Sequence, residues 1–266
     1  MRRLLVGVGT PLGYSLASCK SFSECLSYKE ALKGVPRCRE AVLVAPSATS
    51  LAGRGFGREG KALIDAVVRA ARRLFLLSSI EVYATRGLPL DETHPANGSP
   101  ERAWLPVFER HVIKSHSHAT VLRLPDVFGR NMMRGAAGSF LDHDASQINS
   151  VAIHQWYPVR RLDSDIAAAR GIDAPVINLC PEPLPMTAVL SELFPGQMGH
   201  VKTPAPYSRI RTRFAEAFGG ASGYIMSAAE ALQEIGDFVR PLRRPPPEVR
   251  AKCFWTPPPH RPAAAA

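Results

Sequence analysis

The sequence lacks paired cysteines and long apolar runs, and each absence excludes a class of protein. Its 266 residues hold five cysteines and no Cys-x-x-Cys pair, which argues against a disulfide framework and against a structural zinc site. No run of about 18 apolar residues occurs, so no membrane span is expected. The apolar start at Met1–Val6 breaks at Gly7 without a later A-x-A cleavage motif, and it predicts a first strand instead of a signal peptide. A cytoplasmic protein is therefore expected.

Acidic residues are scarce as well. The chain has 23 Asp and Glu against 33 Lys and Arg, which gives a net charge of +10 and an isoelectric point of about 9.7. Such basicity raises the question of nucleic acid or of an acidic ligand. No aromatic run alternates with the arginines as in single-strand binders, so a solvated arginine-rich surface is favoured and nucleic acid is not expected as a partner.

Strands and helices alternate along the first two thirds of the chain. Five apolar runs predict strands near residues 3–8, 41–46, 74–79, 119–124 and 175–180. Helical patterns between these runs predict a Rossmann-like, doubly wound α/β fold with a mainly parallel sheet. The predicted divisions are a nucleotide-binding domain at 1–180, a small helical cap at 181–240 over the carboxyl ends of the strands, and a disordered Pro- and Arg-rich tail at 241–266. Within the cap, Arg209–Phe218 predicts an amphipathic helix.

A glycine turn follows the first predicted strand. Gly7, Gly9 and Gly13 surround Thr10, and such a turn lets the backbone approach a pyrophosphate at the start of a helix. A glycine-rich turn alone is weak evidence, and a plain strand-to-helix turn is the alternative. Its position at the start of an α/β chain favours the nucleotide-binding interpretation.

The segment between Gly13 and Ala41 is short for a complete dinucleotide-binding half. Such a half needs a second strand ending in Asp or Glu about 20 residues on, where the acid holds the adenosine ribose. Residues 21–28 form a poor strand pattern, and Glu24 is the only acid near their centre. We therefore expect a sheet shortened by a unit and weak or lost binding of a dinucleotide.

Polar residues follow two further strands. Ser78 and Ser79 end one apolar run, and Tyr83 comes four residues later. Pro125 follows the strand that ends at Leu124. Because ligands of doubly wound sheets bind at the carboxyl ends of strands, these residues are expected to line one cleft with the glycine turn.

The motifs LLSSIEVYA, LPLDETHP and TVLRLPDVFGR, taken in this order with the glycine turn, resemble the extended short-chain dehydrogenase/reductases of the nucleotide-sugar epimerase and dehydratase type. The resemblance implies NAD or NADP as cofactor and a small-molecule substrate. Of the family pattern Gly-x-x-Gly-x-x-Gly, Gly7 and Gly13 match, and Thr10 replaces the middle glycine. The implied cofactor contacts are Gly7, Gly9, Thr10, Gly13, Ala45, Pro46, Ser78, Leu124, Pro125 and Val127.

The catalytic residues of that family are matched only in part. Ser79 matches the catalytic Ser or Thr, but the Tyr-x-x-x-Lys pair is missing. With Glu109 aligned to a family Glu, Glu101 stands in the place of the tyrosine and Leu105 in the place of the lysine. A leucine can neither lower the pKa of a phenol nor hold a ribose. Glu101 could serve as an acid or base if burial raised its pKa.

Three functions remain open from the sequence. The first is a NAD(P)-dependent epimerase, dehydratase or reductase with a degenerate site, whose candidate catalytic residues are Ser79, Glu101 and Tyr83, with His94 or His111 as other stand-ins. The second is a repurposed non-redox enzyme, such as a cyclase, isomerase or lyase. The third is a non-catalytic binding protein. A fold alone does not choose between them, and the substrate and a possible homodimer stay undetermined.

Overall fold

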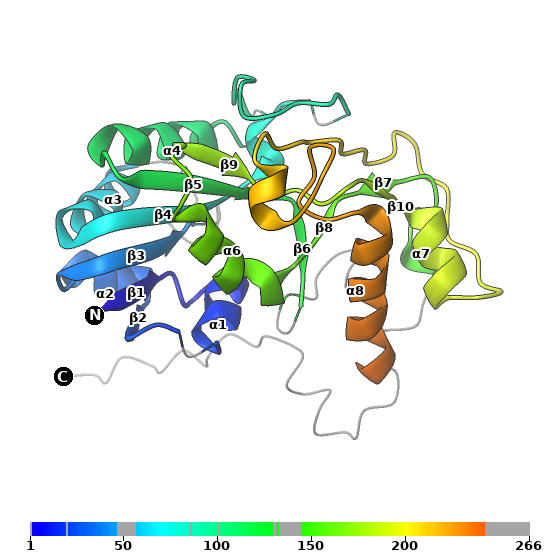
Figure 1. Cartoon of the computed structure of the whole chain (residues 1–266), viewed down its shortest axis with the longest axis horizontal. Helices are drawn as coiled ribbons and strands as arrows, with labels where there is room; N and C mark the ends of the chain where they lie inside the picture. The colour runs from blue at the N-terminus through cyan, green and yellow to red at the C-terminus, as the bar shows by residue number, and fades with distance from the viewer. Residues whose placement is uncertain are drawn as a thin grey trace, which may run out of the picture.

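The fold was established from a computed structural model, which describes residues 2–19, 21–46, 57–85, 87–99, 102–129, 132 and 145–242. Two lobes lie side by side in Figure 1. The larger lobe carries the amino terminus and a central sheet, and the smaller lobe lies at the end toward which the strands point. Glu101 and most of the tail at 241–266 fall outside the described residues.

The larger lobe is built on a six-stranded sheet in which every neighbouring pair is parallel. In spatial order the strands are β2 (Glu24–Leu26), β1 (Arg3–Val6), β3 (Cys38–Val44), β4 (Ala71–Ser79), β5 (Ala119–Leu124) and β9 (Val176–Asn178). The chain places β2 on one side of β1 and β3 on the other, so the strand order reverses beside β1. Doubly wound sheets bind ligands at such a reversal. The predicted fold class is confirmed.

The usual dinucleotide-binding sheet has the order 3-2-1-4-5-6. This sheet also has six strands, but on the β2 side of β1 it has one strand instead of two, and β9 adds a strand at the opposite edge. In the described part of the chain β2 is the edge strand, and the strand that would normally lie beyond it does not occur. The poor pattern at residues 21–28 nevertheless yields β2. This three-residue strand forms because Leu4–Val6 supplies its hydrogen bonds in parallel register.

Helices cover both faces of the sheet. One face packs against α2 (Tyr28–Lys33), α3 (Arg58–Ala70) and α4 (Trp104–Ser115), and the other packs against α1 (Pro11–Ala17) and α6 (Leu162–Ala169). Alternation along β1 shows the same division, since Leu4 and Val6 enter one apolar cluster and Leu5 enters the other. Burial on both faces explains why the strands read as continuous apolar runs.

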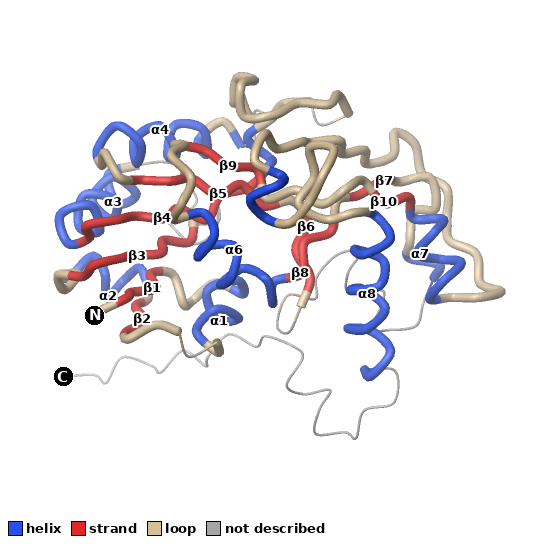
Figure 2. The backbone as a smooth tube through the Cα atoms, in the orientation of Figure 1, coloured by secondary structure: helices blue, strands red, loops and turns tan. Residues whose placement is uncertain are grey.

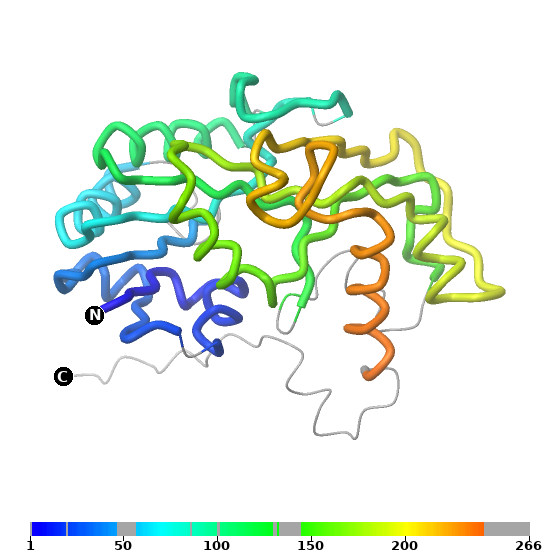
Figure 3. Tube along the Cα trace, in the orientation of Figure 1, coloured from blue at the N-terminus to red at the C-terminus, as the bar shows by residue number. Residues whose placement is uncertain are grey.

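The smaller lobe combines two separate parts of the chain. Strand β6 (Asp126–Phe128) pairs with β8 (Trp156–Pro158), and β7 (Ile153–His154) pairs with β10 (Leu184–Pro185). Helices α7 (Met186–Leu193) and α8 (Ala228–Leu242) share an apolar cluster with these strands, which includes Phe128, Ile148, Trp156, Leu190, Phe194 and Ile235. Figure 2 shows that loops make up much of this lobe, and Figure 3 shows its two parts lying together.

Candidate functional site

The carboxyl ends of four strands lie side by side and form one edge. Register pairs Val6 with Leu43 and Ser79 with Leu124, so β1, β3, β4 and β5 end next to one another. The residues predicted to contact a cofactor follow these ends. Ser79, Thr10, Ala45 and Val127 are half-buried and Gly9 is exposed, whereas Gly7, Gly13, Pro46, Ser78, Leu124 and Pro125 are buried.

The glycine turn after β1 keeps its shape through Thr10. The Thr10 hydroxyl donates to the carbonyl oxygen of Gly7 at 2.8 Å and accepts from the backbone N–H of Gly13 at 3.0 Å. A Cβ atom on Gly13 would lie 2.1 Å from the oxygen of Gly7, so this position requires glycine. The Thr10 hydroxyl thus satisfies a backbone N–H group of the turn itself. Thr10 is the residue that replaces the middle glycine of the family pattern.

Tyr28 covers the point where the strand order reverses. It is the first residue of α2, two positions beyond the end of β2, and its ring lies so close to Gly7 that a Cβ atom there would be 2.9 Å from it. Its hydroxyl donates to the carbonyl oxygen of Val44, the last residue of β3, at 2.9 Å. Burial raises the pKa of the phenol above its usual value despite a hydrogen bond with Thr10, so the hydroxyl stays protonated. The side chain therefore bridges β2 and β3 across the glycine turn.

A buried ion pair lies below the end of β4. Arg123 donates to Glu109 from Nη2 at 2.7 Å, and their side chains are only 5% and 3% exposed. Ser78 donates to the same carboxylate at 2.6 Å. Burial alone would lower the pKa of Arg123, but Glu109 outweighs it and raises that pKa, so the guanidinium stays charged. The Ser78 hydroxyl thus donates its hydrogen bond to a buried group of the protein itself.

Tyr83 sits at the centre of the same network and is 2% exposed. Its hydroxyl accepts from Arg123 Nη1 at 2.8 Å and from the Asn178 side-chain amide at 3.0 Å, and it donates to the carbonyl oxygen of Asp91 at 3.0 Å. A phenol has one proton and two lone pairs, so these three bonds use its full capacity. In this arrangement Tyr83 holds β5, β9 and the loop at 87–94 together.

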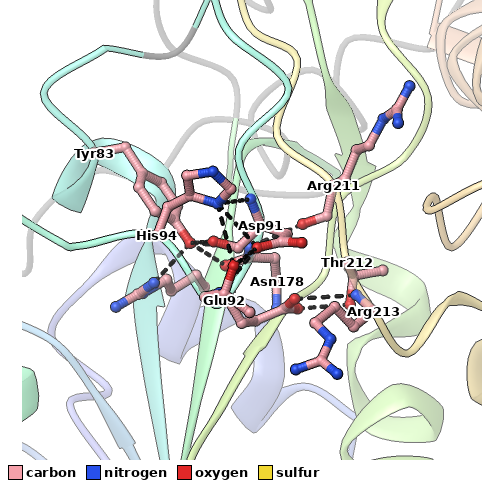
Figure 4. Close-up of polar contacts among 10 residues, drawn as sticks. Tyr83, Asp91, Glu92, His94, Asn178, Arg211, Thr212 and Arg213 are labelled. Atoms are coloured by element: carbon pink, nitrogen blue, oxygen red, sulfur yellow. Dashed lines mark hydrogen bonds and ion pairs between the residues drawn. The ribbon is translucent and has the colours of Figure 1, made fainter.

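Glu92 fastens the smaller lobe to the end of β9, as Figure 4 shows. Its Oε1 accepts from the backbone N–H of Asn178 at 2.8 Å and from the Thr212 hydroxyl at 2.6 Å, and its Oε2 accepts from the backbone N–H of Arg213 at 3.0 Å. The Asn178 side chain adds a bond to the carbonyl oxygen of Arg211 at 2.9 Å. One carboxylate thus orders the loop that borders this end of the sheet.

Replacing Glu92 by glutamine is expected to lower the free energy of unfolding by about 1–3 kcal/mol, because the new amide group would face backbone donors. Urea denaturation measures the loss, and hydrogen exchange at the Arg213 amide should speed up. Glu216→Gln is the matched control, since Glu216 is exposed. Equal stability of the two variants would mean that Glu92 does not hold this loop.

No protein-family model matches this sequence, and no curated protein sequence matches it either. Solved structures match throughout the chain. One is a UDP-N-acetylglucosamine 4-epimerase from Bacillus cereus, with a TM-score of 0.64 and 14% identity over 90% of this chain and 100% of that chain. Another is WbmH from Bordetella bronchiseptica in complex with NAD+, with a TM-score of 0.67 and 12% identity over 91% and 99%.

A functionally unknown conserved protein from Silicibacter pomeroyi also matches, with a TM-score of 0.60 and 20% identity over 89% of this chain and 98% of that chain. The chain has the fold of the extended short-chain dehydrogenase/reductases. At these identities the likeness concerns the fold, and it confirms the resemblance that the motifs LLSSIEVYA and TVLRLPDVFGR indicate.

The structure locates part of the catalytic set that the sequence predicts. Leu105, aligned with the family lysine, is buried in an apolar cluster with Ile80, Val82 and Tyr83. Ser79 stays half-buried, and its hydroxyl oxygen accepts from the backbone N–H of Glu81 at 3.2 Å. Glu101 lies outside the described residues. Of the three candidate catalytic residues, Ser79 is thus half-buried, Tyr83 is 2% exposed, and Glu101 is not described.

Sequence reasoning missed Tyr28, Glu92 and the pair of Glu109 and Arg123 as organisers of the site. A signal was present for one of them, because a charged Arg123 inside the apolar run at 119–124 needs a buried partner. The described residues contain no group of three or more His, Cys, Asp or Glu side chains arranged to bind a metal ion. None of the described helices is long and apolar enough to cross a membrane.

Proposed function

We propose that this chain is an epimerase- or dehydratase-like protein that binds NAD or NADP weakly and acts on a nucleotide sugar or a small keto or hydroxy compound with a degenerate catalytic set. The observation that supports this proposal is the edge formed by four strand ends, where the glycine turn and Ser79 lie along one side of the sheet. WbmH, which shares the fold, was solved with NAD+.

The residues fit a dinucleotide only in part. The turn from Gly7 to Gly13 fits a pyrophosphate, and Ser79 and Pro125 fit the nicotinamide end. The adenosine end does not fit the arrangement as it stands, because the Tyr28 ring covers Gly7. Glu30, the first acid after β2, accepts from the Ser27 N–H and hydroxyl at 2.8 and 2.7 Å in a helix cap. The Glu30 carboxylate is therefore not free to hold a ribose.

When bound, NAD(P) supplies a hydride acceptor or donor, and the chain must supply the proton transfer. Ser79 orients a substrate hydroxyl in this proposal, and Glu101 is the proposed acid or base. Leu105 cannot replace the family lysine, since it is apolar and buried. The catalytic set is thus reduced compared with the family pattern, and slow turnover is expected.

Titration with NADH and NADPH, followed by nicotinamide fluorescence, tests this function. We expect saturable binding about 10- to 100-fold weaker than at a site with a ribose-binding acid, because one charged hydrogen bond contributes about 1.5–3 kcal/mol. Ser79→Ala and Glu101→Gln should then reduce turnover on any substrate found. A flat titration with both dinucleotides would remove the cofactor from the proposal.

The second candidate is a repurposed, non-redox enzyme or a binding protein that uses the same edge. The full hydrogen bonding of Tyr83 and the burial of Leu105 favour it, since neither leaves an acid or base for hydride chemistry. It predicts no dinucleotide binding together with retention of another small molecule. The same titration therefore separates the two candidates.

A further inference from the structure

A hollow of about 780 Å³ lies at the amino ends of the strands, on the opposite edge of the sheet from the proposed NAD(P) site. Figure 1 shows the amino ends of β1, β3 and β4 on the side of the sheet away from the smaller lobe. Five arginines line the hollow, namely Arg2, Arg37, Arg39, Arg69 and Arg72. Its size falls within the range of small-molecule sites, which is about 300–1,000 Å³.

A second hollow adjoins the first and continues its charge. The two share Arg2, Arg39 and Arg72, and the second adds Arg3, Arg73, Arg170 and Glu40. Together the two linings hold eight arginines against one glutamate, a net charge of +7, in a chain whose net charge is +10. Eight of the 33 Lys and Arg residues of the chain therefore lie along this edge.

The single glutamate does not neutralise the first hollow. Glu40 is bound to Arg3 at 2.6 Å and to Arg170 at 2.7 Å, both of which belong to the second hollow. Within the described part of the chain, no carboxylate lies within ion-pair distance of Arg2, Arg37, Arg69 or Arg72. Four like charges that surround one hollow repel one another, and a bound anion would relieve this repulsion.

We propose that this hollow, the arginine hollow, binds a small compound with two or more adjacent phosphate groups. Its cations are all arginines, whose planar guanidinium groups donate two parallel hydrogen bonds to phosphate oxygens. The other lining residues are Cys38, Ala70 and Ala71, whose small side chains leave room for the ligand. Among the described residues no aromatic side chain lines it, so this part of the chain offers it no stacking surface like that of single-strand nucleic-acid binders.

Calorimetric titration with tripolyphosphate at constant ionic strength tests the arginine hollow. Arg69→Gln/Arg72→Gln removes two of its charges at exposed positions, and Arg110→Gln/Lys202→Gln removes two exposed charges elsewhere. We expect the first double variant to bind about 100- to 10,000-fold more weakly than the unaltered protein, because two charged hydrogen bonds are lost. The second double variant should bind as the unaltered protein does.

Three results would overturn the proposal. The first is no saturable binding of tripolyphosphate, and the second is equal weakening by both double variants, which would indicate charge attraction without a site. The third is tighter binding of a single-stranded RNA oligonucleotide than of tripolyphosphate. If Arg69→Gln/Arg72→Gln fails to fold, Arg37→Gln provides the same comparison at one exposed side chain.

Discussion

Replacing Glu109 by glutamine is expected to lower the free energy of unfolding by about 3–5 kcal/mol, the usual cost of breaking a buried ion pair. Arg123 would keep its charge in a setting where its side chain is 5% exposed. Ser78 would also lose a charged acceptor at 2.6 Å. Urea denaturation monitored by circular dichroism measures the effect.

Two further variants make the Glu109 result specific. Asp173→Asn removes an exposed carboxylate and should change stability by less than about 0.5 kcal/mol. Glu109→Leu/Arg123→Met removes both charges and should be more stable than Glu109→Gln, because no uncompensated charge remains. If the double variant is the least stable of these variants, an unpaired charge on Arg123 is not the cause of the loss in Glu109→Gln.

Replacing Tyr28 by alanine is expected to have two opposite effects. Stability should fall by about 3–5 kcal/mol, because a large ring leaves a buried site. Affinity for NADH or NADPH should rise about tenfold, since the ring no longer has to leave Gly7 before the adenosine end can enter. Urea denaturation and nicotinamide fluorescence measure the two effects on the same protein.

Tyr28→Phe separates the hydroxyl from the ring. It removes the bond to the Val44 carbonyl oxygen, which contributes about 1 kcal/mol, and leaves the ring over Gly7, so dinucleotide affinity should stay close to that of the unaltered protein. Tyr14→Ala is the control, because Tyr14 is 49% exposed. If Tyr28→Ala binds dinucleotides no better than Tyr14→Ala does, the ring is not the obstacle.

The parallel sheet could be predicted because its strands are apolar on both faces and alternate with helical patterns. The predicted helix at Arg209–Phe218 was wrong for most of its length, since only Ala215–Phe218 forms a short 3-10 helix. The N–H groups of Arg211 and Thr212 bond instead to Leu90 and Gly223, at 2.7 and 2.8 Å. Apolar spacing cannot reveal such distant acceptors, and tertiary contacts override it here.

The candidate site was predictable to a similar extent. Strand order alone places Gly7 and Ser79 along one edge, and the structure places their strands accordingly. The position of the Tyr28 ring could not be predicted, because it depends on β3 ending where its last carbonyl oxygen can accept from the phenol. The roles of Ser79 and Glu101 remain predictions, and Glu101 lies outside the described residues.

The hydrogen bonds of Glu92 connect residues far apart in sequence, and they limit where the chain can be cut into stable fragments. Its donors Thr212 and Arg213 lie 120 and 121 positions further along the chain. During synthesis Glu92 is therefore made long before Thr212 and Arg213. Hydrogen bonds between residues so far apart in sequence are expected to form late in folding. A fragment that stops at Cys180 would contain every strand of the main sheet yet lack two of the three donors to Glu92. We therefore expect a fragment that ends at residue 180 to be less stable at the end of β9 than the same strand is in the whole chain.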